Sequence, residues 1–191
     1  MKNAIIIHGM PDKEEYLADP ERQHTENQHW LIWITRELIA KGIAAEAPLM
    51  PIPYFPEYEA WKSTFEQFPI NDETILIGHS CGGGFIVRYL SEHNIRVGKV
   101  VLVAPWLNPR HYLKNDMFDF SIDESIVSKT SGITIFNSKD DDAEIQESVA
   151  TIVSSVKDIK LVEFEHMGHF CYGDMGTDAF PELLNEALSL T

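Results

Sequence analysis

Short apolar runs recur along the chain, and stretches whose apolar residues follow helical spacing separate them. The runs predict buried strands at Ala4–Ile7, Ile43–Ala47, Thr74–Gly78, Val97–Trp106, Ile133–Phe136 and Lys160–Glu165. Pro105 ends the fourth run, because proline cannot donate a hydrogen bond to a ladder. The spacing predicts helices at Glu26–Lys41, Glu57–Phe68, Cys81–His93, near Asp123–Lys129, and at Ala143–Val156 and Pro181–Leu188.

This alternation predicts the fold class. Strands that alternate with helices imply a parallel sheet covered by helices on both faces. We therefore expect an α/β fold, a three-layer α/β/α sandwich with a mostly parallel sheet of about six strands and no large cap domain. No linker, internal repeat or change of composition divides the chain, so residues 1–191 are expected to form one domain.

Two segments do not follow the alternation. Asp12–Thr25 is mostly polar and contains Pro20, which predicts a surface loop. Pro48–Pro56 holds four prolines among apolar side chains and suits neither a central strand nor a helix interior. We expect it either to form part of a pocket wall or to cover the sheet.

Ser121 or Asp123 would cap the short helix near residues 123–129.

Composition and charge narrow the classes of function. The formal net charge of −15 argues against a nucleic-acid partner and against anionic membrane surfaces, since both require clustered Lys and Arg. The two cysteines, Cys81 and Cys171, form no disulfide framework and suit a reducing compartment. The first apolar run is too short for a signal peptide or a membrane span, so a cytoplasmic location is expected.

The third apolar run leads into Gly78-His79-Ser80-Cys81-Gly82, a G-x-S-x-G pattern between a predicted strand and a predicted helix. A serine on such a turn projects its hydroxyl beyond the carboxyl end of the strand. Gly78 and Gly82 let the strand and the helix approach each other closely. The helix N-terminus also offers free N–H groups to a developing oxyanion. The pattern is that of the nucleophile elbow of α/β-hydrolases, and it predicts Ser80 as the nucleophile.

A second interpretation exists, because glycine-rich turns after strands also cradle phosphate groups. A phosphate-binding loop ends in Gly-Lys-Ser/Thr, whereas Gly82-Gly83-Gly84 continues into Phe85-Ile86-Val87. A dinucleotide-binding turn usually follows the first strand and has an acidic residue about 20 positions later. The position of the turn therefore favours the nucleophile.

A serine hydroxyl needs a base, and the base needs an orienting acid, in the chain order Ser, Asp or Glu, His. The last predicted strand leads into His166-Met167-Gly168-His169-Phe170, where His169 follows a glycine at a turn that would face Ser80. His166 is the competitor and lies closer to the strand. The His-x-x-His spacing also suggests a metal site, but no further cluster completes one, so neither a metal nor another cofactor is expected.

The acid is predicted one strand earlier. Ile133–Phe136 leads into Asn137-Ser138-Lys139-Asp140-Asp141-Asp142, and the spacing leaves open which of these three aspartates orients the base. The alternative is a solvated acidic loop that caps the next helix, and one carboxylate can act on the histidine while its neighbours cap. For the oxyanion we expect the N–H groups of Cys81 and of Met10, which follows the first strand.

Taken together, these residues resemble the small single-domain serine hydrolases of the α/β-hydrolase superfamily typified by retinoblastoma-binding protein nine. The similarity covers nearly the whole chain and is carried by His8-Gly9, Ile77–Gly82, Val100–Val103, Ser138–Asp141 and Gly168–Phe170. In that family the Ser-x-Asp-Asp pattern has the triad acid on its second aspartate, which implies Asp141, and the Gly-His-Phe histidine implies His169. The resemblance also implies a compact hydrolase with carboxylesterase-, amidase- or aminopeptidase-like activity. This chain departs from the family where Asp142-Ala143-Glu144 replaces a turn that is often apolar and contains proline.

The substrate is less determined by the sequence. Trp61, Trp106, Phe118 and Phe120 are candidates for an apolar acyl site, with core packing as their alternative role. We expect Trp106 and Phe170 to contact substrate. No long insertion is available for a lid, which favours small ester or amide substrates, including aminoacyl or peptide substrates, over long lipids.

Other functions stay open at this stage. Acyl transfer would use the same residues, and a non-catalytic protein-binding scaffold would keep the fold alone, because a fold does not impose a function. No particular protein partner is predicted. A redox role for Cys81 and Cys171 is disfavoured, since neither has an evident activating partner.

Overall fold

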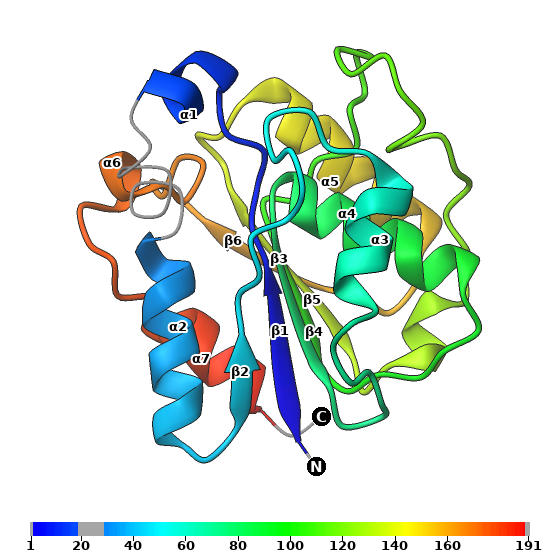
Figure 1. Cartoon of the computed structure of the whole chain (residues 1–191), viewed down its shortest axis with the longest axis vertical. Coiled ribbons are helices and arrows are strands. Elements are labelled where there is room, and N and C mark those ends of the chain that lie inside the picture. The colour runs from blue at the N-terminus through cyan, green and yellow to red at the C-terminus, as the bar shows by residue number, and fades with distance from the viewer. Residues whose placement is uncertain (1, 19–28, 190–191) are drawn as a thin grey trace.

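The computed structural model describes residues 2–18 and 29–189. Within these residues, one parallel sheet has the strand order β2-β1-β3-β4-β5-β6 (Figure 1). The strands are β1 (Asn3–Ile7), β2 (Ala44–Glu46), β3 (Ile75–His79), β4 (Val100–Val103), β5 (Ile133–Ser138) and β6 (Lys160–Phe164). β3 is buried throughout and pairs with β1 and β4, which explains why its run is apolar without alternation.

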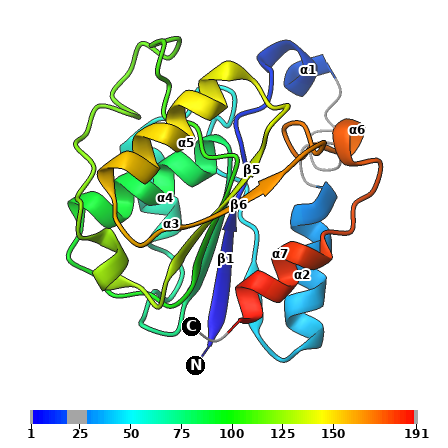
Figure 2. The ribbon, with the colours of Figure 1, turned by 180° about the vertical axis from the view of Figure 1, so that it is seen from behind.

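Helices cover both faces of the sheet. They are α1 (Lys13–Ala18), α2 (His29–Ala40), α3 (Tyr58–Phe65), α4 (Cys81–Glu92), α5 (Ala143–Ser155), α6 (Tyr172–Met175) and α7 (Pro181–Leu188), with a 3₁₀ turn η2 at Ile126–Lys129. α2 and α7 pack together on one face, and α3, α4 and α5 cover the other (Figures 1 and 2). The predicted three-layer α/β fold is confirmed.

The strand order creates a switch point between β1 and β3. The chain passes from β1 to β2 on one side and then returns to place β3 on the other side of β1. In open parallel sheets, clefts form outside the carboxyl ends of the strands at such a point. The loop after β1 and the turn after β3 therefore lie beside each other.

The loop expected at Asp12–Thr25 is wrong in its first part, because Lys13–Ala18 forms α1. Asp12 caps this helix: its Oδ1 accepts the N–H groups of Glu14 at 2.8 Å and Glu15 at 3.0 Å. Residues 19–25 of the expected loop lie outside the described residues. So do residues 26–28 of the helix expected at Glu26–Lys41.

The short helix expected near Asp123–Lys129 is a single 3₁₀ turn, and its cap differs from the expectation. Its N-cap is Ser125, which makes no capping hydrogen bond with its side chain. Asp123 instead accepts the N–H of Ser125 at 2.9 Å and its hydroxyl at 2.7 Å. Neither Ser121 nor Asp123 occupies the cap position.

A buried carboxylate ties together the amino end of the sheet. The Glu186 side chain of α7, only 9% exposed, lies 2.7 Å from Lys99 Nζ and 2.6 Å from Lys160 Nζ, and accepts the Thr134 hydroxyl at 2.7 Å. Burial alone would raise the pKa of Glu186, but these hydrogen bonds outweigh it and hold the pKa at about 2.

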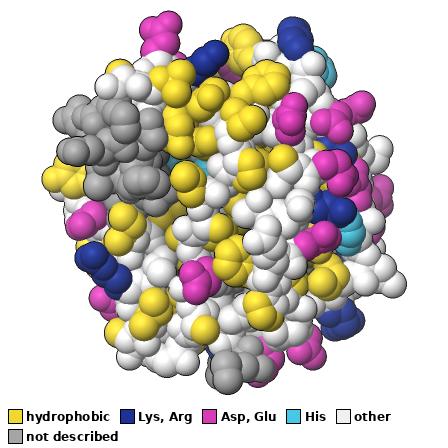
Figure 3. Space-filling view, in the orientation of Figure 1, with side chains coloured by type: hydrophobic (Ala, Val, Ile, Leu, Met, Phe, Trp, Pro, Cys, Tyr) yellow, Lys and Arg dark blue, Asp and Glu magenta, His cyan; other side chains and the backbone are white. Residues whose placement is uncertain are grey.

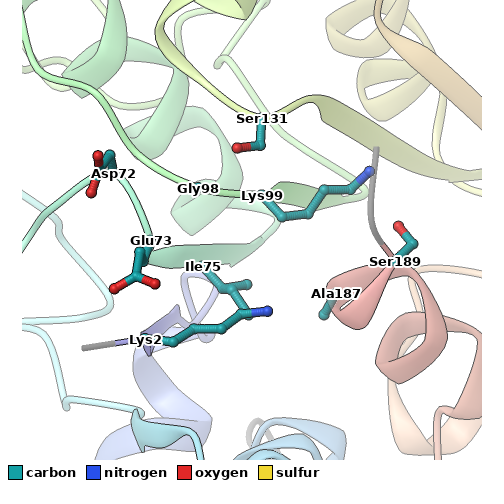
Figure 4. A pocket seen from close by; sticks show the side chains of 9 residues that line it. All are labelled: Lys2, Asp72, Glu73, Ile75, Gly98, Lys99, Ser131, Ala187 and Ser189. Carbon is teal, nitrogen blue, oxygen red and sulfur yellow. The ribbon is translucent and has the colours of Figure 1, made fainter.

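A cavity of about 240 Å³ opens beside this network, at the amino ends of β3 and β4 (Figure 4). It is lined by Lys2, Asp72, Glu73, Ile75, Gly98, Lys99, Ser131, Ala187 and Ser189. The charge of Lys99 in its wall is already paired with Glu186. None of the described helices is long and apolar enough to span a membrane.

Candidate active site

Ser80 occupies the sharp turn between β3 and α4, with φ of 50° and ψ of −119°. A residue with a side chain adopts such a φ only where its surroundings hold it there. Its N–H donates to the carbonyl of Val103 at 2.9 Å, and its own carbonyl accepts the N–H groups of Gly84 at 3.1 Å and Trp106 at 3.0 Å. The segments around β4 and α4 thus hold the serine in a strained turn at the edge of the cleft.

Gly82 allows α4 to start against the end of β1. A Cβ at this position would lie 2.4 Å from the carbonyl oxygen of Ile7 and 2.5 Å from that of His8. These are backbone atoms, which cannot move away without distorting the end of β1 and the loop after it. A Cβ at Gly78 would in turn lie 2.7 Å from the carbonyl oxygen of Gly82, so β3 and α4 approach each other as closely as the G-x-S-x-G pattern predicts.

His169 and Asp141 form a hydrogen-bonded pair. His169 Nδ1 lies 2.9 Å from Asp141 Oδ2 and 3.1 Å from Oδ1. The Asp141 side chain is 2% exposed, whereas the His169 side chain is 32% exposed. A buried carboxylate that accepts Nδ1–H selects the tautomer whose Nε2 is free to accept a proton. His169 lines the same cleft as Ser80.

The two neighbouring aspartates face other groups. Asp140 Oδ1 accepts the Ser138 hydroxyl at 2.5 Å and the N–H of Gly168 at 3.0 Å, and these hydrogen bonds lower the pKa of Asp140. Asp142 is the N-cap residue of α5, and its N–H donates to Asp141 Oδ1 at 2.7 Å. Of the three candidates, the structure brings Asp141 to the histidine.

His166 lies apart from this pair. Its side chain is 88% exposed, and its Nδ1 lies 3.7 Å from Asp140 Oδ2. The two histidines of the His-x-x-His pattern therefore face different carboxylates. Among the residues that the structure describes, no group of three or more His, Cys, Asp or Glu side chains is placed to hold a metal ion.

The cleft above Ser80 has a volume of about 210 Å³ and a partly apolar wall. It is lined by Met10, Ser80, Trp106, Tyr112, Asp142, Glu144, Ile145 and His169. Trp106 is fixed in this wall, because its indole N–H donates to Glu144 at 3.2 Å and its ring meets that of Phe118 edge-on at 5.3 Å. A smaller hollow of about 50 Å³ is lined by Gly9, Met10, Pro11, His79, Ser80, His169 and Cys171.

Two backbone segments flank Ser80 as the oxyanion hypothesis requires. A Cβ at Gly9 would lie 3.1 Å from the Cβ of Ser80, so the loop after β1 passes directly against the turn that holds Ser80. Met10 follows in that loop and lines the cleft. Cys81 is the first residue of α4, and the first N–H groups of a helix have no intrahelical acceptor.

Neither cysteine has the environment of a reactive thiol. The Cys81 side chain is fully buried, and this burial raises its pKa well above the ordinary value. Burial also raises the pKa of Cys171 to about 11, with further contributions from the charges of Asp174 and Asp141. Both thiols therefore stay protonated near neutral pH.

Phe170 is not a cleft residue, contrary to the expectation that it contacts substrate. Its side chain has no exposed surface and packs on Phe180 and Phe164, with ring centroids 5.6 Å and 5.5 Å away. The turn sends His169 into the cleft and the next side chain into the core. His169 and Phe170 are adjacent in the sequence, and nothing in the sequence indicates that their side chains point in different directions.

The other aromatic candidates also lie away from Ser80. Trp61 is fully buried and donates its indole N–H to the carbonyl of Pro51 at 2.9 Å. Phe118 and Phe120 line a separate groove of about 600 Å³ between α5 and the segment after β4. Of the four aromatic side chains proposed for an acyl site, Trp106 alone is among those that line the described cleft.

The segment Pro48–Pro56 packs against the loop that follows β1. The N–H of Met50 donates to His8 Nε2 at 2.9 Å, and His8 Nδ1 lies 2.7 Å from the carbonyl of Gly9. His8 is therefore neutral with its proton on Nδ1, and burial lowers its pKa. None of the described residues that line the cleft comes from this segment.

Exposed apolar side chains lie on segments at the carboxyl ends of the strands. Figure 3 shows apolar side chains gathered at the upper end of one face. Large exposed apolar side chains at this end are Leu17 of α1, Leu49, Ile52 and Phe55 of the proline-rich segment, Tyr112 after β4, and Tyr172 of α6.

A parallel sheet with a strained serine at its carboxyl edge, and a histidine–carboxylate pair in the same cleft, defines a compact α/β-hydrolase fold. The chain belongs to the serine hydrolase family, whose sequence model matches residues 19–186. Over 165 residues it is 28% identical to the YdeN protein of Bacillus subtilis (strain 168), with 83% of this chain and 86% of that protein covered. The family places the chain among hydrolytic enzymes.

Solved structures show the same fold. The crystal structure of the ydeN gene product from B. subtilis matches with a TM-score of 0.78 at 24% identity, and the match covers 97% of this chain and 96% of that chain. Est1E from Butyrivibrio proteoclasticus, solved with ferulic acid bound, matches with a TM-score of 0.64 at 17% identity, covering 98% and 86% of the two chains.

Proposed function

We propose that this protein hydrolyses small esters or amides through a triad of Ser80, His169 and Asp141. The observation that supports this most directly is the 2.9 Å contact between His169 Nδ1 and the buried carboxylate of Asp141, in the cleft that Ser80 also lines. A scaffold without catalysis has no use for a strained serine that shares a cleft with an oriented imidazole.

The proposed reaction proceeds in two steps through an acyl-enzyme. His169 Nε2 takes the proton of the Ser80 hydroxyl as its oxygen attacks the substrate carbonyl, and then delivers that proton to the leaving group. Asp141 keeps the imidazole in the required tautomer and stabilises its positive form. The N–H groups of Cys81 and Met10 receive the oxyanion. Water, deprotonated by His169, then releases the acid and restores Ser80.

The cleft supports a small substrate with an apolar group. Its volume of about 210 Å³ is below the usual range of about 300 to 1,000 Å³ for ligand pockets, and Trp106, Tyr112 and Ile145 supply apolar surface. We therefore propose short-chain carboxylesters, small amides or aminoacyl compounds, as in the retinoblastoma-binding protein nine type of hydrolase. We further propose that the activity resides in one domain, residues 1–191, and in the cytoplasm.

A panel of short p-nitrophenyl esters and aminoacyl amides tests this function with purified wild-type protein and Ser80→Ala. We expect hydrolysis by the wild type and a loss of at least about 10³-fold in kcat for the variant, because the nucleophile is absent. Adding an alcohol or amine acceptor and analysing the products separates hydrolysis from acyl transfer. Unchanged turnover in Ser80→Ala would remove the proposal.

A further inference from the structure

Side chains from other parts of the chain hold the backbone around His169. Four N–H groups of residues 167–171 donate to side-chain oxygens: Met167 to Ser138 Oγ at 2.8 Å, Gly168 to Asp140 Oδ1 at 3.0 Å, His169 to Asp174 Oδ2 at 3.1 Å and Cys171 to Asp174 Oδ2 at 3.2 Å. We call residues 167–171 the histidine loop. Its conformation therefore depends on groups outside it.

The carbonyl groups of the histidine loop are held in the same way. His79 Nε2–H donates to the carbonyl of His169 at 2.8 Å, and the indole N–H of Trp30 donates to the carbonyl of Phe170 at 3.0 Å. His79 immediately precedes Ser80, and its ring lies 4.9 Å from that of His169. One hydrogen bond thus connects the nucleophile turn to the backbone of the residue that serves as the base.

Asp174 differs from the other groups because one of its oxygens accepts two N–H groups, that of His169 and that of Cys171, on either side of the His169 side chain. The loop is shaped to receive this carboxylate: Gly168 has φ of 49°, and a Cβ there would lie 2.5 Å from Asp174 Cγ. The same oxygen accepts the N–H groups of residues 169 and 171. The carboxylate therefore spans the strained turn at Phe170, whose φ is 56°.

We propose that Asp174 is a positioning residue for His169, which fixes the direction in which the imidazole meets Ser80. This rests on the proposed triad and adds a residue to it that contacts neither substrate nor the reacting atoms. Asp141 orients the ring through Nδ1, whereas Asp174 orients the backbone from which the ring projects. Misplacing a catalytic group by about 1 Å costs about 10²-fold in rate, so the backbone anchor affects turnover.

An alternative role for Asp174 is purely local, namely to stabilise the start of α6. Asp174 lies in the first turn of α6, where a carboxylate stabilises a helix start by accepting the N–H of Cys171. Capping predicts a change in stability with turnover unchanged. Positioning predicts a fall in kcat with KM unchanged, together with recovery by any side chain that restores the acceptor oxygen.

The experiment compares Asp174→Ala, Asp174→Asn and the control Asp178→Ala with the wild type, using p-nitrophenyl acetate. Asparagine keeps an oxygen that accepts both N–H groups, whereas alanine removes it. We expect a 10- to 100-fold lower kcat for Asp174→Ala with KM within about twofold, and kcat within about threefold of wild type for Asp174→Asn. Asp178 is exposed and lies beyond α6, so Asp178→Ala should retain wild-type kcat.

Circular dichroism and thermal unfolding accompany the kinetics. If Asp174→Ala does not fold, Asp174→Ser replaces it with the same expectation, since its hydroxyl is too short to reach both N–H groups. A kcat in the alanine or serine variant within twofold of an active wild type overturns this proposal alone, as does a loss that asparagine does not recover. A wild-type protein without Ser80-dependent hydrolysis overturns the proposed function and this proposal together.

Discussion

Three consecutive aspartates differ in what their carboxylates face, and this contact decides the chemistry of each. Asp141 is buried against the His169 ring, Asp140 accepts the N–H of Gly168, and Asp142 starts α5. The order of catalytic residues along the chain, together with the end of the predicted strand Ile133–Phe136, limits the candidates for the acid to these three positions. Spacing could not choose among them, because the choice depends on the path of a turn, and only the family resemblance implied Asp141.

Asp141→Asn should lower kcat by about 10³- to 10⁴-fold, because the amide no longer selects the tautomer with Nδ1–H. Stability should change little by comparison, since asparagine has nearly the same volume. The measurement is kcat on p-nitrophenyl acetate, with Asp158→Asn, an exposed aspartate between α5 and β6, as the matched control. A loss of less than tenfold would show that Asp141 is not the acid.

The direction of the Phe170 side chain is a second feature that the sequence did not predict. The Gly-His-Phe pattern marks both residues as neighbours of the site, yet Phe170 stacks on Phe180 in the core. Its position in the chain places Phe170 next to His169. The direction of its side chain, however, depends on a backbone φ of 56° at Phe170, which no property of phenylalanine favours.

Among the elements, the turn from β3 into α4 is tightly held, because the ends of β1 and β4 both contact it. The strand and the long helix were predictable from continuous apolar runs and helical spacing. The short helices α1 and α6 were not, since a polar stretch of four to six residues gives little periodicity. Their starts are marked by single side chains rather than by a pattern: Asp12 accepts the N–H of Glu15, and Asp174 accepts the N–H of Cys171.

Gly82→Ala should destabilise the protein by roughly 3 kcal/mol, because its Cβ would overlap the carbonyl oxygens at the end of β1. The free energy of unfolding from urea denaturation measures this. Gly173→Ala is the matched control: it lies in α6, nothing lies within 4 Å of its added Cβ, and alanine favours a helix. Equal stability of the two variants would contradict the close packing of α4 on β1.

On the scale of the whole molecule, the two ends of the sheet carry different charged networks. The residues of the proposed triad lie after β3, β5 and β6, at the carboxyl ends of the strands, while Glu186 joins Lys99, Lys160 and Thr134 at the amino ends. The alternation of strands and helices predicted the layers. It could not predict this network, because its members come from four segments far apart in the chain.

Glu186→Gln should reduce the free energy of unfolding at pH 7 by roughly 2 to 3 kcal/mol, because two lysines lose their buried partner. The folded pKa of Glu186 is about 2, below its ordinary 4.5. Its contribution to stability is therefore full above pH 4.5 and is lost as the pH falls from about 4.5 towards 2. The difference between wild type and variant should shrink over that window.

Urea denaturation at pH 7 and pH 3 checks this prediction, with the exposed Glu182→Gln in the same helix as control. Turnover at pH 7 should be unchanged, since the network lies at the opposite end of the sheet from Ser80. A stability difference that is independent of pH would contradict the assignment of the low pKa to Glu186.

The most direct measurement of the central claim is mass spectrometry of the folded protein after reaction with a fluorophosphonate probe. The probe reacts with a serine only where a base and an oxyanion site activate it. We predict one adduct per chain, located on Ser80 by peptide mapping, and no adduct in a folded Ser80→Ala variant. A folded wild-type protein that stays unlabelled, or that is labelled at another residue, would contradict the account.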